Sequence, residues 1–336
     1  MITVPEVGSE GLKRLQSAHV TIVGLGGVGS AAAFYLAQTG VGHLRLIDQD
    51  IVEPSNLHRL HGADQSHLYH PKAEVAAETL PHYAPWTKTE PIIDTLRASN
   101  VNELLRGSDI VVDGLDNFRT RYLLNQYSYE TSTPYVFASA VQNQGHLGVI
   151  HPPETGCLEC EIPGVLDRPE ESCESLGVTP TIIGLVGGFA ASEVTKILLH
   201  MQGGLMGRLL TIDTVGPDFV VVKVPKRKGC RICDGDGSKP ELPEADPVTI
   251  LCGGRVINVL PKLPLSLDLD LVSRSVPDRD ILAVSTAVLV YRKGPIVVSL
   301  FHTGRMLIEG VEGREEALQI ATDTWRQAAG RLAALA

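Results

Sequence analysis

The sequence lacks the long apolar runs that would mark a membrane protein or a secreted one. Its most apolar stretch, Ile182–Ala191, is much shorter than the ~20 residues that cross a bilayer, and Glu193 and Lys196 interrupt the apolar pattern after it. The first residues, Met1–Ser9, contain no apolar signal-peptide core. We therefore expect neither a membrane segment nor a leader, and we expect a cytoplasmic location.

An excess of basic residues is also missing, because the chain of 336 residues has a net charge of -10. Broad nucleic-acid binding needs a basic face, so this balance argues against it. One short basic cluster occurs around Lys226–Arg231, without interleaved aromatics, which is typical of a solvated loop. The 43% hydrophobic and 20% charged residues exclude disorder over the whole chain. The length predicts about two domains.

The chain has six cysteines, and in a cytosolic protein of this length we do not expect them to form disulfides. Four of them form two pairs, Cys157-x-x-Cys160 and Cys230-x-x-Cys233. Four thiolates can close a tetrahedral zinc site, so the sequence predicts a zinc knuckle. Such a site has no open coordination position, and its zinc would be structural rather than catalytic.

Strand and helix signals alternate over residues 18–140, which predicts a doubly wound, Rossmann-like α/β fold with helices on both faces of a parallel sheet. The expected strands are 18–23, 43–47, 88–93, 109–112 and 135–140. The expected helices are 30–38, 72–80, 101–105 and 117–129.

The pattern changes after residue 150. We interpret 151–180 as a loop, 181–199 as a buried helix whose glycines allow close packing, and 208–213 with 219–224 as a hairpin. A linker rich in glycine, proline and charge occupies 229–243. The predicted domains are therefore 1–240, which would bind the nucleotide and the zinc, and 245–336, a small α+β domain.

A glycine-rich turn follows the first strand and opens a helix, with the sequence GLGGVG at 24–29. Glycine allows a tight turn and close approach to a phosphate, and the helix N-terminus adds free N–H groups. Asp48 ends the next strand, where its carboxylate could accept hydrogen bonds from a ribose. The predicted nucleotide-binding residues here are Gly24, Gly26, Gly27, Gly29 and Asp48. On these residues alone, NAD and ATP both remain open.

Two further segments favour a triphosphate. Residues 50–59 read DIVEPSNLHR and precede Lys72, and residues 113–121 read DGLDNFRTR. Cationic side chains offset phosphate charge, and a carboxylate can hold Mg²⁺. A hydride-transfer enzyme needs fewer such groups, so an NAD-dependent oxidoreductase is disfavoured. The candidates in these segments are Asp50, Asn56, Arg59, Lys72, Asp116 and Asn117.

Over about residues 8–235 the chain resembles the ubiquitin-activating-type adenylyltransferases, on the pattern GxGGxG, a strand ending in Asp, SNLxR, a Lys and DxxDNxxxR. This family includes the activators of molybdopterin and thiamine sulfur carriers and of ubiquitin-like modifiers. The resemblance implies that Asp48 holds the ribose and that Asn56, Arg59 and Lys72 contact the phosphates. It implies that Asp116 binds Mg²⁺ and is catalytic, and it supports the zinc knuckle.

The substrate implied by the resemblance is the C-terminal glycine carboxylate of a β-grasp carrier or ubiquitin-like protein that ends in Gly-Gly. A homodimer and a downstream conjugating protein are also implied. The position of Cys173 resembles that of cysteines that form a persulfide-type link or a thioester, whereas its acidic neighbours indicate a bystander thiol.

The chain departs from the family pattern in three places. No basic N-terminal segment with a matching arginine is visible, Leu60 replaces the usual glutamine after SNLxR, and Gly145-His146 replaces the usual Gly-Gln. The missing arginine keeps a second hypothesis open, a catalytically weak nucleotide-binding scaffold that recruits partners through the small domain.

Overall fold

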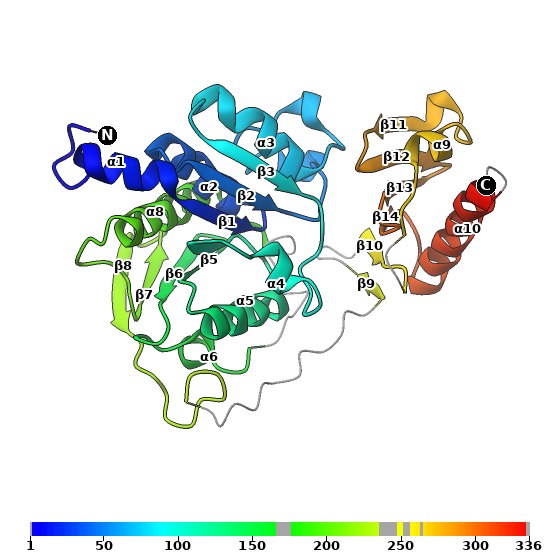
Figure 1. The fold of residues 1–336 in the computed structure, drawn as a ribbon. Coiled ribbons are helices and arrows are strands. Elements are labelled where there is room, and N and C mark those ends of the chain that lie inside the picture. The colour runs from blue at the N-terminus through cyan, green and yellow to red at the C-terminus, as the bar shows by residue number, and fades with distance from the viewer. Residues whose placement is uncertain (1, 166–175, 235–246, 251–255, 263–264, 334–336) are drawn as a thin grey trace. The chain divides into compact units, whose positions relative to one another are not determined.

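The computed structural model describes residues 2–165, 176–234, 247–250, 256–262 and 265–333 (Figure 1). The chain forms two compact units. The larger unit spans residues 1–243 apart from two short segments, and the smaller unit contains residues 244–336.

The larger unit contains an eight-stranded sheet in the order β3-β2-β1-β4-β5-β6-β7-β8 (Figure 1). The strands from β3 to β5 pair in parallel, and β6, β7 and β8 continue the sheet in antiparallel. The central strands are apolar and buried, as strands covered on both faces must be. Their bounds are β1 His19–Val23, β2 His43–Ile47, β3 Lys88–Ile92, β4 Ile110–Asp113, β5 Tyr135–Val141, β6 Gln144–Ile150, β7 Arg208–Asp213 and β8 Asp218–Lys223.

Helices cover both faces of this sheet, as the alternating pattern predicts. Helices α2 and α8 pack together over strands β5 and β6, whereas α5 and α6 belong to a second apolar cluster with Tyr135 and Phe137. The helices are α1 Gly8–Ser17, α2 Gly27–Thr39, α3 Lys72–Tyr83, α4 Val101–Leu104, α5 Phe118–Thr131, α6 Leu158–Glu161 and α8 Pro180–Leu198.

Close packing explains Gly187 of α8, as expected, but not Gly184, where an added Cβ atom would meet nothing within 4 Å. A Cβ atom on Gly187 would lie 2.5 Å from the Cβ of Ala31 in α2, which no side chain could tolerate. The prediction that α8 is buried on nearly every face is wrong, because Leu185 and Phe189 are only half-buried. By length and composition α8 could cross a membrane, with a mean hydropathy of 1.4, but here it packs against α2, β5 and β6.

Two elements of the larger unit are missing from the sequence-based prediction. Helix α1 precedes the first strand, and β6 follows β5 through a tight reversal at Gln142, which has a φ of 52°. The two glycines of β6 and its polar start mask its strand pattern. The region 151–180, expected to be a loop, contains the short helix α6.

The smaller unit is an antiparallel six-stranded sheet in the order β11-β12-β13-β14-β10-β9, with two helices. Its core forms where the sheet packs against the apolar face of the last helix, through Ala317 and Ala321. Its elements are β9 Val248–Ile250, β10 Val256–Val259, α9 Leu269–Ser273, β11 Ile281–Val284, β12 Val288–Lys293, β13 Ile296–Phe301, β14 Met306–Glu309 and α10 Arg314–Ala333.

Candidate functional site

The order of the strands places a natural crevice between β1 and β4. The chain runs from β1 outward to β3 and then returns to β4 on the other side of β1, so the connections after β1 and β4 run in opposite directions along the sheet. Ligands of open α/β sheets bind at such a switch point, beyond the carboxyl ends of the strands. The glycine-rich turn follows β1, and the loop with Asp116 follows β4, so both predicted segments meet here.

The two loops touch through glycine. Gly24 has a φ of 87°, and a Cβ atom on it would lie 2.7 Å from the backbone of Gly114. A Cβ atom on Gly29 would lie 1.8 Å from the carbonyl oxygen of Gly24. Helix α2 begins at Gly27 without a side-chain cap, so its first N–H groups suit a phosphate.

Asp48 lies directly after β2 and is 7% exposed. Its Oδ2 accepts a hydrogen bond from the Leu25 N–H at 2.5 Å, and its Oδ1 accepts one from the Asp50 N–H at 2.7 Å. Burial raises the pKa of Asp48. The carboxylate therefore ties the glycine-rich turn to β2, and it retains lone pairs for a ribose hydroxyl.

Lys72 is the cation of this crevice, at the start of α3. Its Nζ lies 3.5 Å from Oδ2 of Asp50, and its side chain is 13% exposed. Burial alone would lower the pKa of Lys72, but carboxylates raise it strongly, so the side chain stays charged. The carboxylates that act on it belong to Asp50, Asp48, Glu53 and Asp116. Carboxylates from two separate loops, after β2 and after β4, are thus brought together around one ammonium group.

Asn56 and Arg59 lie on and just after the 3-10 turn Pro54–Asn56, which belongs to the same segment as Glu53. Asn56 is 2% exposed, and its Oδ1 accepts from the Glu53 N–H at 3.4 Å. Arg59 donates from Nη1 to the carbonyl oxygen of Ser55 at 2.8 Å. Glu53 acts on Lys72, so this turn lies beside the crevice.

Asp116 is exposed at the end of the β4–α5 loop. The following residue, Asn117, caps α5, since its Oδ1 accepts from the Thr120 N–H at 2.9 Å. The Nδ2 of Asn117 lies 3.3 Å from Oδ1 of Asp116. The Asp116 carboxylate therefore faces solvent at a helix N-terminus, where a metal ion or a phosphate could reach it.

A buried charged cluster that sequence reasoning missed lies under this loop. Oδ2 of Asp113 accepts from the Arg121 Nε at 3.1 Å and from the Tyr135 hydroxyl at 2.7 Å. The first two residues belong to the DxxDNxxxR motif, but Tyr135 lies in an apolar strand that gives no sequence signal. Burial and Asp113 raise the pKa of Tyr135 well above its usual range, so its hydroxyl stays a donor.

The four predicted cysteine ligands meet at the start of α6. The sulfur atoms of Cys157, Cys160, Cys230 and Cys233 all lie within 4.8 Å of one another. Individual Sγ–Sγ distances are 3.9, 3.5 and 3.3 Å, too long for disulfides. A zinc ion with Zn–S bonds of about 2.3 Å sets tetrahedral edges of about 3.8 Å. Burial and neighbouring thiols raise the pKa of Cys157, whereas the pKa of Cys230 is lowered to about 7, because hydrogen bonds outweigh the effect of burial.

Two other predicted features have different outcomes. Cys173 lies outside the described residues. Within the described ranges, the four cysteines are the one group of side chains close enough to share a metal ion, and no His, Asp or Glu belongs to such a group. Burial lowers the pKa of His61, which lies between the 3-10 turn Pro54–Asn56 and α3.

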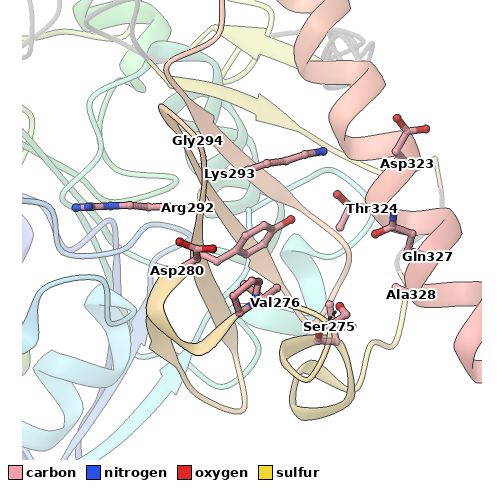
Figure 2. Close-up of a pocket in the computed structure, with 13 residues that line it drawn as sticks. Ser275, Val276, Asp280, Arg292, Lys293, Gly294, Asp323, Thr324, Gln327 and Ala328 are labelled. Carbon is pink, nitrogen blue, oxygen red and sulfur yellow. Dashed lines mark hydrogen bonds between the residues drawn. The ribbon is translucent and has the colours of Figure 1, made fainter.

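A cavity of about 340 Å³ lies in the smaller unit, and none of the residues predicted to bind the nucleotide lines it. Asp280, Lys293 of β12 and the α10 residues Asp323, Thr324 and Gln327 line it (Figure 2). Its mixture of both charge signs favours no particular ligand class.

Comparison with known proteins places the larger unit in a family. The ThiF family matches residues 1–232. The chain is 37% identical to the SAMP-activating enzyme E1 of Haloferax volcanii over 73% of this chain and 90% of the relative. It is 35% identical to the sulfur carrier protein adenylyltransferase of Thermus thermophilus, over 71% of this chain and 90% of the relative.

A more distant likeness confirms the fold. Escherichia coli MccB, solved with ATP, superposes with a TM-score of 0.59 at 22% identity, over 66% of this chain and 68% of MccB. The adenylyltransferase and sulfurtransferase MOCS3 of Dictyostelium discoideum is 34% identical over 75% of this chain and 59% of its own length.

Proposed function

The chain belongs to the ThiF family, and from this we propose that it uses ATP to adenylate the C-terminal carboxylate of a ubiquitin-like or sulfur-carrier protein. The observation that carries the proposal is the crevice itself. There Lys72, four carboxylates and the uncapped start of α2 converge at the switch point of the sheet. The family match and the two relatives named as activating enzymes support the same reaction.

In this reaction the carrier carboxylate attacks the α-phosphorus of ATP, an acyl–phosphate bond forms, and pyrophosphate leaves. Two anions must approach each other, so the site has to offset their charge. Lys72 and Arg59 would face the phosphates, and the N–H groups at the start of α2 would hold one of them. Asp48 would hold the ribose. No protein nucleophile is needed for this step.

Asp116 would hold Mg²⁺. Magnesium is usually bound by one or two carboxylates together with phosphates and water, rather than by a closed protein cage. The exposed carboxylate of Asp116 fits that pattern, whereas the buried carboxylate of Asp48 does not. When bound, the ion would offset the negative charge on the phosphates and on the leaving pyrophosphate.

The four-cysteine cluster would hold a structural zinc ion, which links the start of α6 to the chain after β8. The thiols require a reducing environment, so a cytoplasmic location stays part of the proposal. The proposal also includes a carrier that ends in Gly-Gly and a downstream conjugating partner. It further includes a second step in which Cys173 captures the adenylate.

We also propose that two copies form a dimer through the half-buried apolar surface of α8 and its surroundings. Phe189 packs its ring 6.3 Å from the ring of Phe219, which is 53% exposed, and Tyr35 is 39% exposed. Contiguous exposed apolar side chains of this kind mark association surfaces.

Pyrophosphate exchange tests the proposed activity. Labelled pyrophosphate should enter ATP when the enzyme is given a β-grasp carrier that ends in Gly-Gly, and not when the carrier lacks those two residues. Asp116→Ala should abolish the exchange and leave the fold intact. A matched control, Asp270→Ala, removes an exposed carboxylate from the smaller unit and should keep wild-type exchange. Full exchange in Asp116→Ala removes that residue from the mechanism, and no exchange in the wild type favours the scaffold hypothesis.

A further inference from the structure

The peptide bond between Leu115 and Asp116 is held by a buried arginine. The Nη2 of Arg121 donates to the carbonyl oxygen of Leu115, which belongs to the peptide group whose nitrogen is that of Asp116. The N–H of Leu115 donates to Oδ1 of Asp113 at 2.8 Å. The N–H and the carbonyl oxygen of Leu115 are therefore both held by one charged pair, Asp113 and Arg121.

Arg121 itself has little freedom to move. Its side chain is 5% exposed, its Nε lies 3.1 Å from Oδ2 of Asp113, and its Nη2 also reaches the carbonyl oxygen of Ala138 at 3.3 Å. The guanidinium lies 5.0 Å from the ring centre of Phe118 and 5.2 Å from that of Phe137. Burial lowers the pKa of Arg121, but Asp113 together with Tyr135 and Asp116 outweighs this effect and raises it, so the group stays charged.

The held loop is also the one that contacts the glycine-rich turn. Gly114 lies against Gly24 and Gly29, where a Cβ atom on Gly114 would come within 2.2 Å of the carbonyl oxygen of Gly24. A shift of the loop would therefore change the distance between Asp116 and the phosphate cradle. Misplacement of a reacting group by about 1 Å can cost ~100-fold in rate.

We propose that Arg121 is a positioning residue for adenylation, which fixes the Asp116 carboxylate relative to the glycine-rich turn through the Leu115 carbonyl. This inference rests on the proposed function. Only the planar fork of arginine can bond Asp113 and Leu115 at the same time while it lies between two aromatic rings. Lysine would keep the charge but lose this geometry.

The control is Tyr135→Phe. This variant removes one hydrogen bond to the same Asp113 oxygen, and the hydroxyl makes no bond to the Leu115 carbonyl. Both variants should lower the thermal stability, because each disturbs a buried hydrogen-bonded cluster. Only Arg121→Lys should change the position of Asp116, so a purely structural role predicts similar kinetics for the two variants.

The experiment compares kcat, KM for ATP and amide hydrogen exchange of residues 113–117 in the full-length wild type, Arg121→Lys and Tyr135→Phe. We expect Arg121→Lys to lower kcat by about 10- to 100-fold, to change KM less than about threefold, and to speed exchange in this segment. Tyr135→Phe should keep kcat within about threefold. Equal kcat losses in both variants, or unchanged exchange and kcat in Arg121→Lys, would overturn the proposal.

Two further arms keep the result interpretable. A wild type without pyrophosphate exchange refutes the proposed function, and the hydrogen exchange of 113–117 then still decides whether Arg121 holds the loop. If Arg121→Lys does not fold, Phe118→Leu removes one ring beside the guanidinium and should lower kcat by about three- to tenfold. An unchanged kcat in that variant would then contradict the positioning role.

Discussion

Replacing Lys72 by methionine should destabilise the larger unit in a pH-dependent way. Lys72 is mostly buried and faces Asp50 at 3.5 Å and the buried Asp48. Removing one partner of a buried pair costs about 3–5 kcal/mol, and Asp50 is one-third exposed, so about 2 kcal/mol is expected near neutral pH. For a unit of this size that corresponds to a fall in Tm of roughly 4–8 °C.

The sign of the pH dependence follows from the two pKa shifts. The pKa of Lys72 is raised in the folded protein, so its stabilising contribution is fully present below its ordinary value of 10.5. The pKa of Asp48 is raised by burial and lowered by Lys72, so the variant raises it further. The destabilisation should therefore deepen as the pH rises through the folded pKa of Asp48, and it should shrink when the protein is acidified.

Denaturant unfolding of the variant and the wild type at pH 8 and pH 5.5 measures this difference. Lys13→Met is the matched control, because Lys13 is exposed on α1 and its loss should leave the free energy of unfolding unchanged. A Lys72→Met protein as stable as the wild type at pH 8, or equally destabilised at both pH values, would refute the account of this crevice.

Three further predictions concern the zinc, the second step and the dimer. Elemental analysis should find one zinc per chain. The variant Cys230→Ser should lose the zinc and unfold more easily, since structural zinc contributes ~10–16 kcal/mol of apparent binding energy. The control Cys173→Ser should keep the zinc, and a metal-free wild type of full stability would contradict the site. Cys173→Ala should retain pyrophosphate exchange and lose any carrier adduct that a reducing agent releases; a wild type that never gains a carrier-sized mass leaves Cys173 a bystander. Light scattering at micromolar concentration should find a dimer that Phe189→Lys weakens. The control Leu318→Lys changes an exposed apolar position of the smaller unit and should leave the dimer intact. A monomeric wild type would refute the proposed dimer.

The sequence predicted the parallel part of the fold well because its signals are local. The strands β1 and β4 are short and largely apolar, and they alternate along the chain with helical segments. Strand β6 escaped prediction because its glycines and its polar start carry no strand signal, and its place is set by pairing with β5 and β7. The burial of α8 was overestimated because apolar composition alone does not show which faces of a helix are covered.

The residues of the candidate site were likewise predictable where their signals are local, and not where they depend on contacts between distant residues. The glycine-rich turn, Lys72 and Asp116 stand in recognisable local motifs. The contacts that position them depend on distant pairs, such as Asp113 with Tyr135, which are 22 residues apart. Sequence spacing predicted the four cysteine ligands but could not show that their sulfur atoms meet.

Transfer of label from ATP to the carrier tests the central claim most directly. Wild-type enzyme, Mg²⁺ and a carrier ending in Gly-Gly are incubated with ATP labelled at the α- or the γ-phosphorus, and the carrier is then isolated. If its carboxylate attacks the α-phosphorus, only the α-label should stay with the carrier, and Asp116→Ala should leave the carrier unlabelled. Label from the γ-position on the carrier, or no label from either position, would contradict adenylation by this site.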